Sequence, residues 1–128
     1  MNENLKKLID NAQKVQETKK AAVRSKSIVE IKRLSEIGCG EVVVEKPLTT
    51  TLIAANQRKG DSLYTLSESI IYPPLDNKEL QKAYGVNNKI ALLKQMFTEE
   101  ELGDLLGVCG SLINSANTIK QKVTDIKN

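Results

Sequence analysis

The 128-residue chain contains no histidine and no tryptophan, and its only aromatic side chains are three Tyr and one Phe. Histidine is the side chain best suited to exchange protons near neutral pH, so its absence removes the commonest general acid or base. No phosphate-binding glycine loop follows a strand-like segment, and no cysteine has a base beside it in the sequence. These absences predict a protein that is not an enzyme.

Cysteine is scarce, and long apolar runs are missing. Cys39 and Cys109 lie far apart in the chain, and no secretory signal precedes them. This usage favours a reducing compartment and, without histidine, argues against a metal site. No apolar run approaches the ~20 residues that a membrane span needs. We therefore expect a cytoplasmic protein with no cofactor, no metal and no membrane contact.

Positive charge is concentrated at the start of the chain. Residues 1–33 hold nine Lys or Arg and four acidic residues, a net charge of +5, whereas the remainder holds ten basic and twelve acidic residues, a net charge of −2. A basic arm can contact a nucleic acid or an acidic protein, or it can serve solubility alone. The scarcity of aromatic rings argues against base stacking. A small DNA-binding or regulatory protein stays as an alternative that only the basic arm supports.

The basic segment also carries an apolar stripe. Residues 4–23 place Leu5, Leu8, Ile9, Ala12 and Val15 at helical spacing, so they predict an amphipathic helix whose second half is exposed. This helix can dock on the rest of the domain or on another chain. We divide the chain into an arm, residues 1–26, and a single compact domain, residues 27–128.

A β-hairpin is predicted over residues 28–46. Val29 and Ile31 alternate with Glu30 and Lys32, and Val42 and Val44 alternate with Val43 and Glu45. The turn-like segment 38–40 separates the two runs. Cys39 within that segment is interpreted as a turn residue. A hairpin is not stable alone in water, so it must lie on helices or be extended by strands from another copy or a partner.

Helices are predicted for most of the remaining domain. One begins near Pro47 and ends at Gly60, and the next is capped by Asp61 or Ser62 and stops before Pro73. Residues 75–112 contain two segments with capping-box spacing and a Tyr-Gly helix end, which together predict three short helices. The capping pairs are Asp76 with Glu79 and Thr98 with Glu101.

The last segment has a heptad-like stripe. Its apolar residues are spaced 4, 3, 4, 3 and are Leu112, Ala116, Ile119, Val123 and Ile126. Such a narrow stripe can lie on the domain's own core or can be offered to another helix. The predicted fold is therefore α+β, mainly α: one β-hairpin packed on a bundle of short helices, with amphipathic N- and C-terminal helices.

Three segments carry a family resemblance. They read EIKRLSEIGCGEVVVEKP, IIYPPLDNKELQKAYGV and KIALLKQMFTEEELGDLLGVCGSL. Together they resemble the XkdN-like tail assembly chaperones of phages and prophages of Gram-positive bacteria, of the contractile-tail type. The resemblance covers residues 28–113, and the basic arm and the 112–128 tail depart from it.

The resemblance implies a non-enzymatic role in the host cytoplasm. Chaperones of this family bind the tape measure protein, keep it soluble during tail assembly and are absent from the mature particle. Many also have a longer form made by ribosomal frameshifting. Apart from the resemblance, the open hairpin edges and the heptad-spaced tail favour self-association. A structural virion component is the remaining alternative. The candidate partner-binding residues are the apolar ones near the two ends: Leu5, Leu8, Ile9, Ala12, Ile113, Ile119, Val123 and Ile126.

Overall fold

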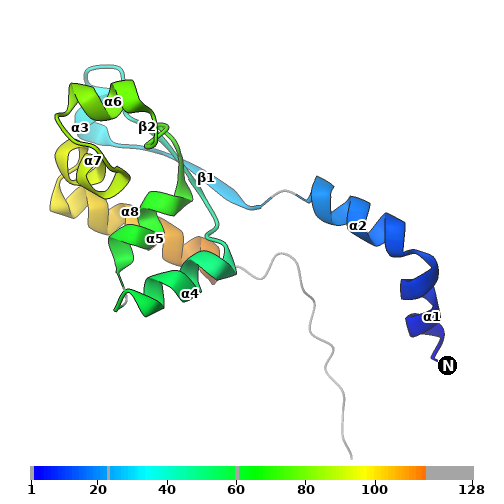
Figure 1. Ribbon diagram of the computed structural model, residues 1–128. Coiled ribbons are helices and arrows are strands. Elements are labelled where there is room, and N and C mark those ends of the chain that lie inside the picture. Colours follow the sequence, from blue (N-terminus) through cyan, green and yellow to red (C-terminus); the bar gives the residue numbers. More distant parts are fainter. Residues whose placement is uncertain (1, 23, 60, 115–128) are drawn as a thin grey trace, which may run out of the picture.

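The computed structural model describes residues 2–22, 24–59 and 61–114. Helices dominate these residues and a small antiparallel sheet joins them, so the predicted α+β, mainly α class is confirmed (Figure 1). The elements in chain order are α1 (Glu3–Asp10), α2 (Ala12–Ala21), β1 (Lys26–Glu30), α3 (Lys32–Ser35), β2 (Glu41–Glu45), α4 (Thr49–Gln57), α5 (Ser62–Ser69), β3 (Ile70–Tyr72), α6 (Lys78–Ala83), α7 (Lys89–Met96) and α8 (Glu99–Ile113).

The sheet contains the predicted hairpin and one strand that was not predicted. β1 and β2 are antiparallel, with Ile28 opposite Val43, and β3 pairs on the other side of β2, with Tyr72 opposite Val43. The sequence pattern had placed Ile70 in the preceding helix. Because α5 ends at Ser69 and Ile70 takes an extended conformation, the chain instead continues directly into a strand.

The hairpin connection is longer than a tight turn, and it contains the single-turn helix α3. Gly38 has a φ of +79°, a left-handed conformation that glycine adopts without steric cost. Gly40 is buried against α3, where a Cβ would lie 2.6 Å from the Ile31 carbonyl oxygen. Glycine at position 40 therefore lets β2 begin in contact with α3.

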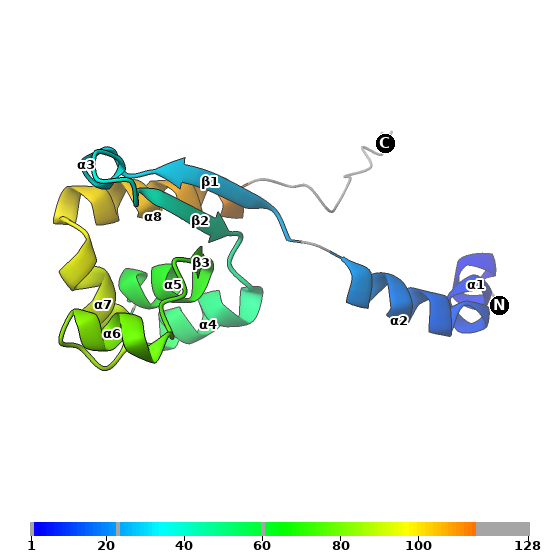
Figure 2. The ribbon, with the colours of Figure 1, turned by 90° about the horizontal axis from the view of Figure 1, so that it is seen from above.

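One face of the sheet meets the helices. The buried side chains on this face are Val42, Val44 and Ile70, and they form one cluster with Leu66 of α5 and Leu105 of α8. α8 runs beside β1 and β2 and also contacts α5 (Figure 2). The second core layer comes from α7, whose Leu92 and Leu93 are fully buried. We call the elements from β1 to α8 the body. Burial of these aliphatic side chains is the main contribution to its stability.

The capping predictions have mixed outcomes. Thr98 and Glu101 form the expected capping box at the start of α8, and Asp61 caps α5 by accepting the Tyr64 N–H at 3.1 Å. The prediction for Asp76 is wrong. Asn77 caps α6 instead and accepts the Leu80 N–H at 2.8 Å, because the turn after Pro74 delays the helix by one residue.

The arm differs from the single helix predicted over residues 4–23. It consists of α1 and α2, which meet at Asn11, and neither contains a buried residue. Figures 1 and 2 both show the two helices lying apart from the body. The boundary between residues 26 and 27 stays a prediction. Among the described residues, no helix combines the length and apolar character that crossing a bilayer requires.

Candidate partner-binding surfaces

The first candidate surface is the apolar face of α1. Leu5, Leu8 and Ile9 lie at positions i, i+3 and i+4, so helical geometry places them on one side, and they are 49%, 51% and 58% exposed. Ala12, the first residue of α2, is exposed as well. The structure thus brings four of the predicted partner-binding residues into one exposed segment.

Local hydrogen bonds define both ends of α1. Asn2 caps the start by accepting the Asn4 N–H at 2.7 Å. Asn11 ends the helix: its backbone N–H and its side-chain Nδ2 both donate to the Lys7 carbonyl, at 2.9 and 2.8 Å. A side chain that satisfies a terminal carbonyl competes with continuation of the helix. The apolar face is therefore confined to a short helix with its own stop signal.

The other predicted residues lie elsewhere. Ile113 is the last residue of α8 and is half-buried. Figures 1 and 2 both show α8 in the body, apart from α1. Ile119, Val123 and Ile126 lie outside the described residues. Of the predicted residues that the structure describes, Ile113 therefore does not lie on the same surface as those of α1.

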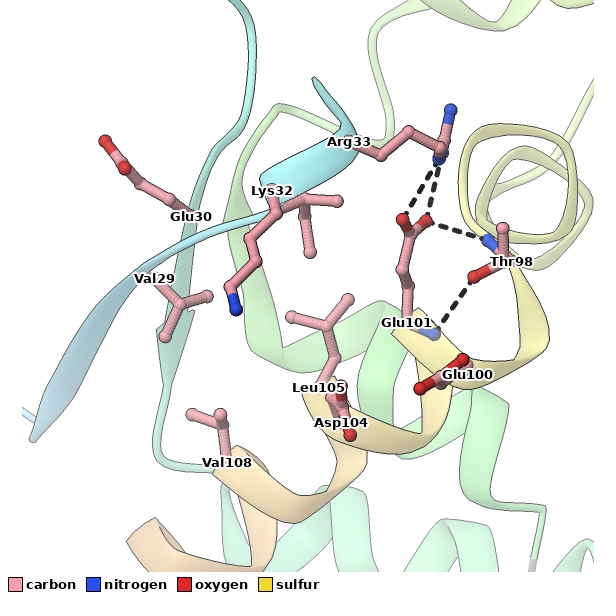
Figure 3. Close-up of a pocket in the computed structure, with 11 residues that line it drawn as sticks. Val29, Glu30, Lys32, Arg33, Thr98, Glu100, Glu101, Asp104, Leu105 and Val108 are labelled. Atoms are coloured by element: carbon pink, nitrogen blue, oxygen red, sulfur yellow. Dashed lines mark hydrogen bonds and ion pairs between the residues drawn. The ribbon is translucent and has the colours of Figure 1, made fainter. Parts of the chain in front are cut away.

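A groove that sequence analysis missed runs between β1, α3 and α8. Its volume is about 630 Å³, and Val29, Leu105 and Val108 form its apolar floor (Figure 3). Lys32 reaches into the groove, and Glu100 and Asp104 lie on the α8 side. The only sequence signal was the alternation at Val29, because the contact with α8 joins segments about 70 residues apart.

An ion pair closes one end of this groove. Arg33 on α3 donates from Nε and Nη2 to the two carboxylate oxygens of Glu101 on α8, at 3.0 and 2.9 Å, and Nη2 also donates to the Met96 carbonyl at 2.8 Å. Glu101 accepts the Thr98 N–H at 2.9 Å as well. The hydrogen bond from Arg33 is the main cause that lowers the pKa of Glu101, and the bond from Thr98 adds to it.

A second groove, of about 540 Å³, lies between α5 and α8. Its apolar walls are Leu63, Phe97, Leu102 and Leu106, and Lys94 and Glu99 stand at its edge. Both grooves therefore combine aliphatic surface with a charged rim. That combination suits the side chains of another polypeptide.

Potentially reactive groups in the body are paired or buried. Burial raises the pKa of the Cys109 thiol, which keeps it protonated and unreactive at neutral pH. Cys39 is exposed in the hairpin connection, where its thiol points to the Leu34 carbonyl at 3.8 Å. No buried side-chain nitrogen or oxygen lacks a hydrogen-bond partner in the described part of the chain. The α1 face and the two grooves therefore offer contacts for binding.

Comparison with known proteins gives one match. Residues 5–127 match the sequence model of the family described as phage XkdN-like tail assembly chaperone protein. The match includes both end segments, which the motifs alone had left outside the resemblance. No curated protein and no solved structure matches the chain.

Proposed function

The chain belongs to the phage XkdN-like tail assembly chaperone family, and from this membership we propose that it binds the tape measure protein and keeps it soluble during tail assembly. A tape measure protein exposes apolar helical surface until the tail tube covers it. A chaperone for such a protein needs apolar contacts that can later be released. The exposed face of α1 supports this proposal most directly.

The size of that face agrees with reversible binding. Full burial of an aliphatic side chain contributes about 1.5–3 kcal/mol. Leu5, Leu8 and Ile9 already have about half of their surface covered, so a partner gains roughly half of that amount from each. Several copies along one long helix add their contributions, yet each copy can leave separately as the tube advances.

The remaining residues extend the same proposal. Ala12 is the exposed first residue of α2, next to the joint at Asn11, and Ile113 is the last residue of α8. We assign Ile119, Val123 and Ile126 to the same partner on their heptad-like spacing. The proposed role involves no catalysis. It places the protein in the host cytoplasm and excludes it from the mature particle, and a longer frameshifted form would share the arm and the body.

Co-expression with the tape measure protein tests the proposal. The apolar variant carries Ser in place of three residues of the α1 face: Leu5, Leu8 and Ile9. A matched control carries Ser in place of Lys7 and Asp10, which lie on the opposite face of α1. The control keeps the net charge, because it removes one cation and one anion. We expect the wild type and the control to co-purify with the tape measure protein, and the apolar variant to lose it. A tape measure protein that is equally soluble without this chain would refute the proposal.

Two alternative functions have separate tests. The basic arm favours nucleic-acid binding, which must weaken steeply with salt because phosphate contacts release counterions. A mobility shift at low and moderate salt distinguishes it from the chaperone role. A structural virion component would be found by mass spectrometry of purified particles, where we expect the chaperone to be absent.

A further inference from the structure

The outer edge of β1 has no strand partner among the described residues, because the sheet order is β1-β2-β3. The Ile31 N–H donates to the Gly40 carbonyl at 2.8 Å, and the Ser25 carbonyl accepts from Lys46 at 2.7 Å. In an antiparallel pair, alternate residues bond to the partner strand. Lys26, Ile28 and Glu30 therefore direct their N–H and C=O groups away from β2.

The side chains of these three residues lie on the sheet face that does not meet α8. Ile28 is 69% exposed there and lies in a cross-strand row with Val43 of β2 and Tyr72 of β3, which is 53% exposed. Figure 3 shows the side chains of Val29 and Glu30 directed to opposite sides of β1. The free edge of β1 thus presents a cation, an exposed aliphatic side chain and an anion at alternate positions.

Within one copy of the chain, the charges at the Glu30 end of β1 repel each other. Glu30 lies directly opposite Glu41 in the β1–β2 register, and like charges at that spacing repel. Neither carboxylate forms an ion pair with another described residue, whereas Glu45 at the other end pairs with Arg24 and Lys26. A cation beside Glu30 on the free edge would offset the repulsion.

We propose that the β1 strands of two copies of this chain pair antiparallel about a twofold axis at Ile28. This register places Lys26 opposite Glu30 of the second copy, Ile28 opposite Ile28, and Glu30 opposite Lys26. The outward backbone groups then face each other at all three positions, and each pair exchanges two hydrogen bonds. Two three-stranded sheets become one continuous sheet, and its apolar row runs from Tyr72 to Tyr72.

Charge complementarity identifies a second copy as the occupant. The edge carries both signs, and the twofold operation brings each sign onto the other, as an isologous interface requires. A shift of one residue would set outward backbone groups against inward ones. A shift of two residues would place either Lys26 or Glu30 opposite Ile28, depending on its direction, and would break both Lys26–Glu30 pairs. The inference concerns pairing between copies and does not depend on tape measure binding.

Charge reversal tests the pairing. In Lys26→Glu alone or Glu30→Lys alone, every Lys–Glu pair across the axis becomes a pair of like charges. Mixing the two variants restores opposite charges at both positions, because the first chain is acidic at 26 and 30 and the second is basic at both. In sedimentation velocity on the full chain, we expect a dimer for the wild type and a dimer for the equimolar mixture. For each single variant we expect the dissociation constant of the dimer to rise by roughly tenfold or more, so that the variant sediments as a monomer.

Two controls keep the test decisive. Glu30→Lys removes the repulsion with Glu41 within the chain, so its monomer should stay folded and unfold in a cooperative thermal transition even though the dimer is lost. Lys82→Glu reverses an exposed charge on α6 and should leave the dimer intact. A monomeric wild type, a dimer that survives either single reversal, or a mixture that stays monomeric would overturn the proposal. A dimer that survives either single reversal would point to the arm or another surface as the site of self-association.

Discussion

Arg33 and Glu101 are 68 residues apart in the chain, yet their side chains form two hydrogen bonds, of 3.0 and 2.9 Å. The same carboxylate completes the capping box of α8 with Thr98. One glutamate therefore starts the longest described helix and also ties that helix to the hairpin connection through α3. This double role makes the α3–α8 junction sensitive to pH.

Acidification should weaken this junction. The pKa of Glu101 is lowered in the folded chain, mainly by the hydrogen bond from Arg33, so the carboxylate stabilises the fold above its unfolded pKa of about 4.3. That contribution is lost as the pH falls through the lower folded pKa. We expect Glu101→Gln to be less stable than the wild type at pH 7 and the difference to shrink at strongly acidic pH. Urea denaturation at pH 7 and at strongly acidic pH measures the difference in unfolding free energy. Glu99→Gln, in the same helical turn, is the control.

The cap of α8 should have a measurable free energy of its own. Thr98 Oγ1 accepts the Glu101 N–H at 3.1 Å, and loss of such a cap costs about 1 kcal/mol. We expect Thr98→Ala to lower the free energy of unfolding by this amount in urea denaturation. Thr98→Ser keeps the hydroxyl and should stay near the wild type. Equal losses in both variants would mean that the threonine methyl group, rather than the cap, is responsible.

Two glycine substitutions should change the free energy of unfolding in opposite directions. In Gly40→Ala the new Cβ would lie 2.6 Å from the Ile31 carbonyl oxygen and 2.7 Å from the Ser35 nitrogen, so the backbone must shift. We expect a loss of about 1–3 kcal/mol, the usual cost of overpacking. Gly107→Ala in α8 meets no atom within 4 Å and should raise stability by about 0.5–1 kcal/mol, because alanine favours the helix. Thermal or urea unfolding of the two variants provides the comparison.

Leucines in the body should contribute to the free energy of unfolding, whereas leucines in the arm should contribute little. Leu105 is 1% exposed in the core, so Leu105→Ala should cost about 2–5 kcal/mol of unfolding free energy. Leu8 lies in a helix with no buried residue, so Leu8→Ala should change global stability by less than about 0.5 kcal/mol. A large loss for Leu8→Ala, measured by urea denaturation of the dilute chain, would show that the arm packs on the body.

Local sequence patterns predicted much of the fold. The alternation around Val42 and Val44 identified the hairpin, and the Thr98–Glu101 spacing located the start of α8. Gly85, with a φ of +69°, ends α6 as the Tyr-Gly pair indicated. Each of these features depends on residues within a few positions of one another. Asp76 shows the limit, because Asn77 one position later was an equally good cap and the preceding turn decided between them.

The candidate surfaces were less predictable. The apolar face of α1 followed from spacing, but spacing cannot say whether such a face is buried or exposed. The groove over Val29 and Leu105 was missed because neither segment shows by itself that it lies beside the other. The free edge of β1 depends on β3 joining the opposite side of β2.

The sequence by itself determined most of the helices, the caps at Asp61 and Thr98, and the hairpin with its alternating faces, because hydrogen bonding within a helix or hairpin and side-chain periodicity act over short distances. Only the tertiary structure decided that Ile70–Tyr72 is a strand, that Arg33 meets Glu101 and that the α1 face stays uncovered. These outcomes depend on which distant surfaces compete to bury each other. That competition is settled by the packing of the whole chain.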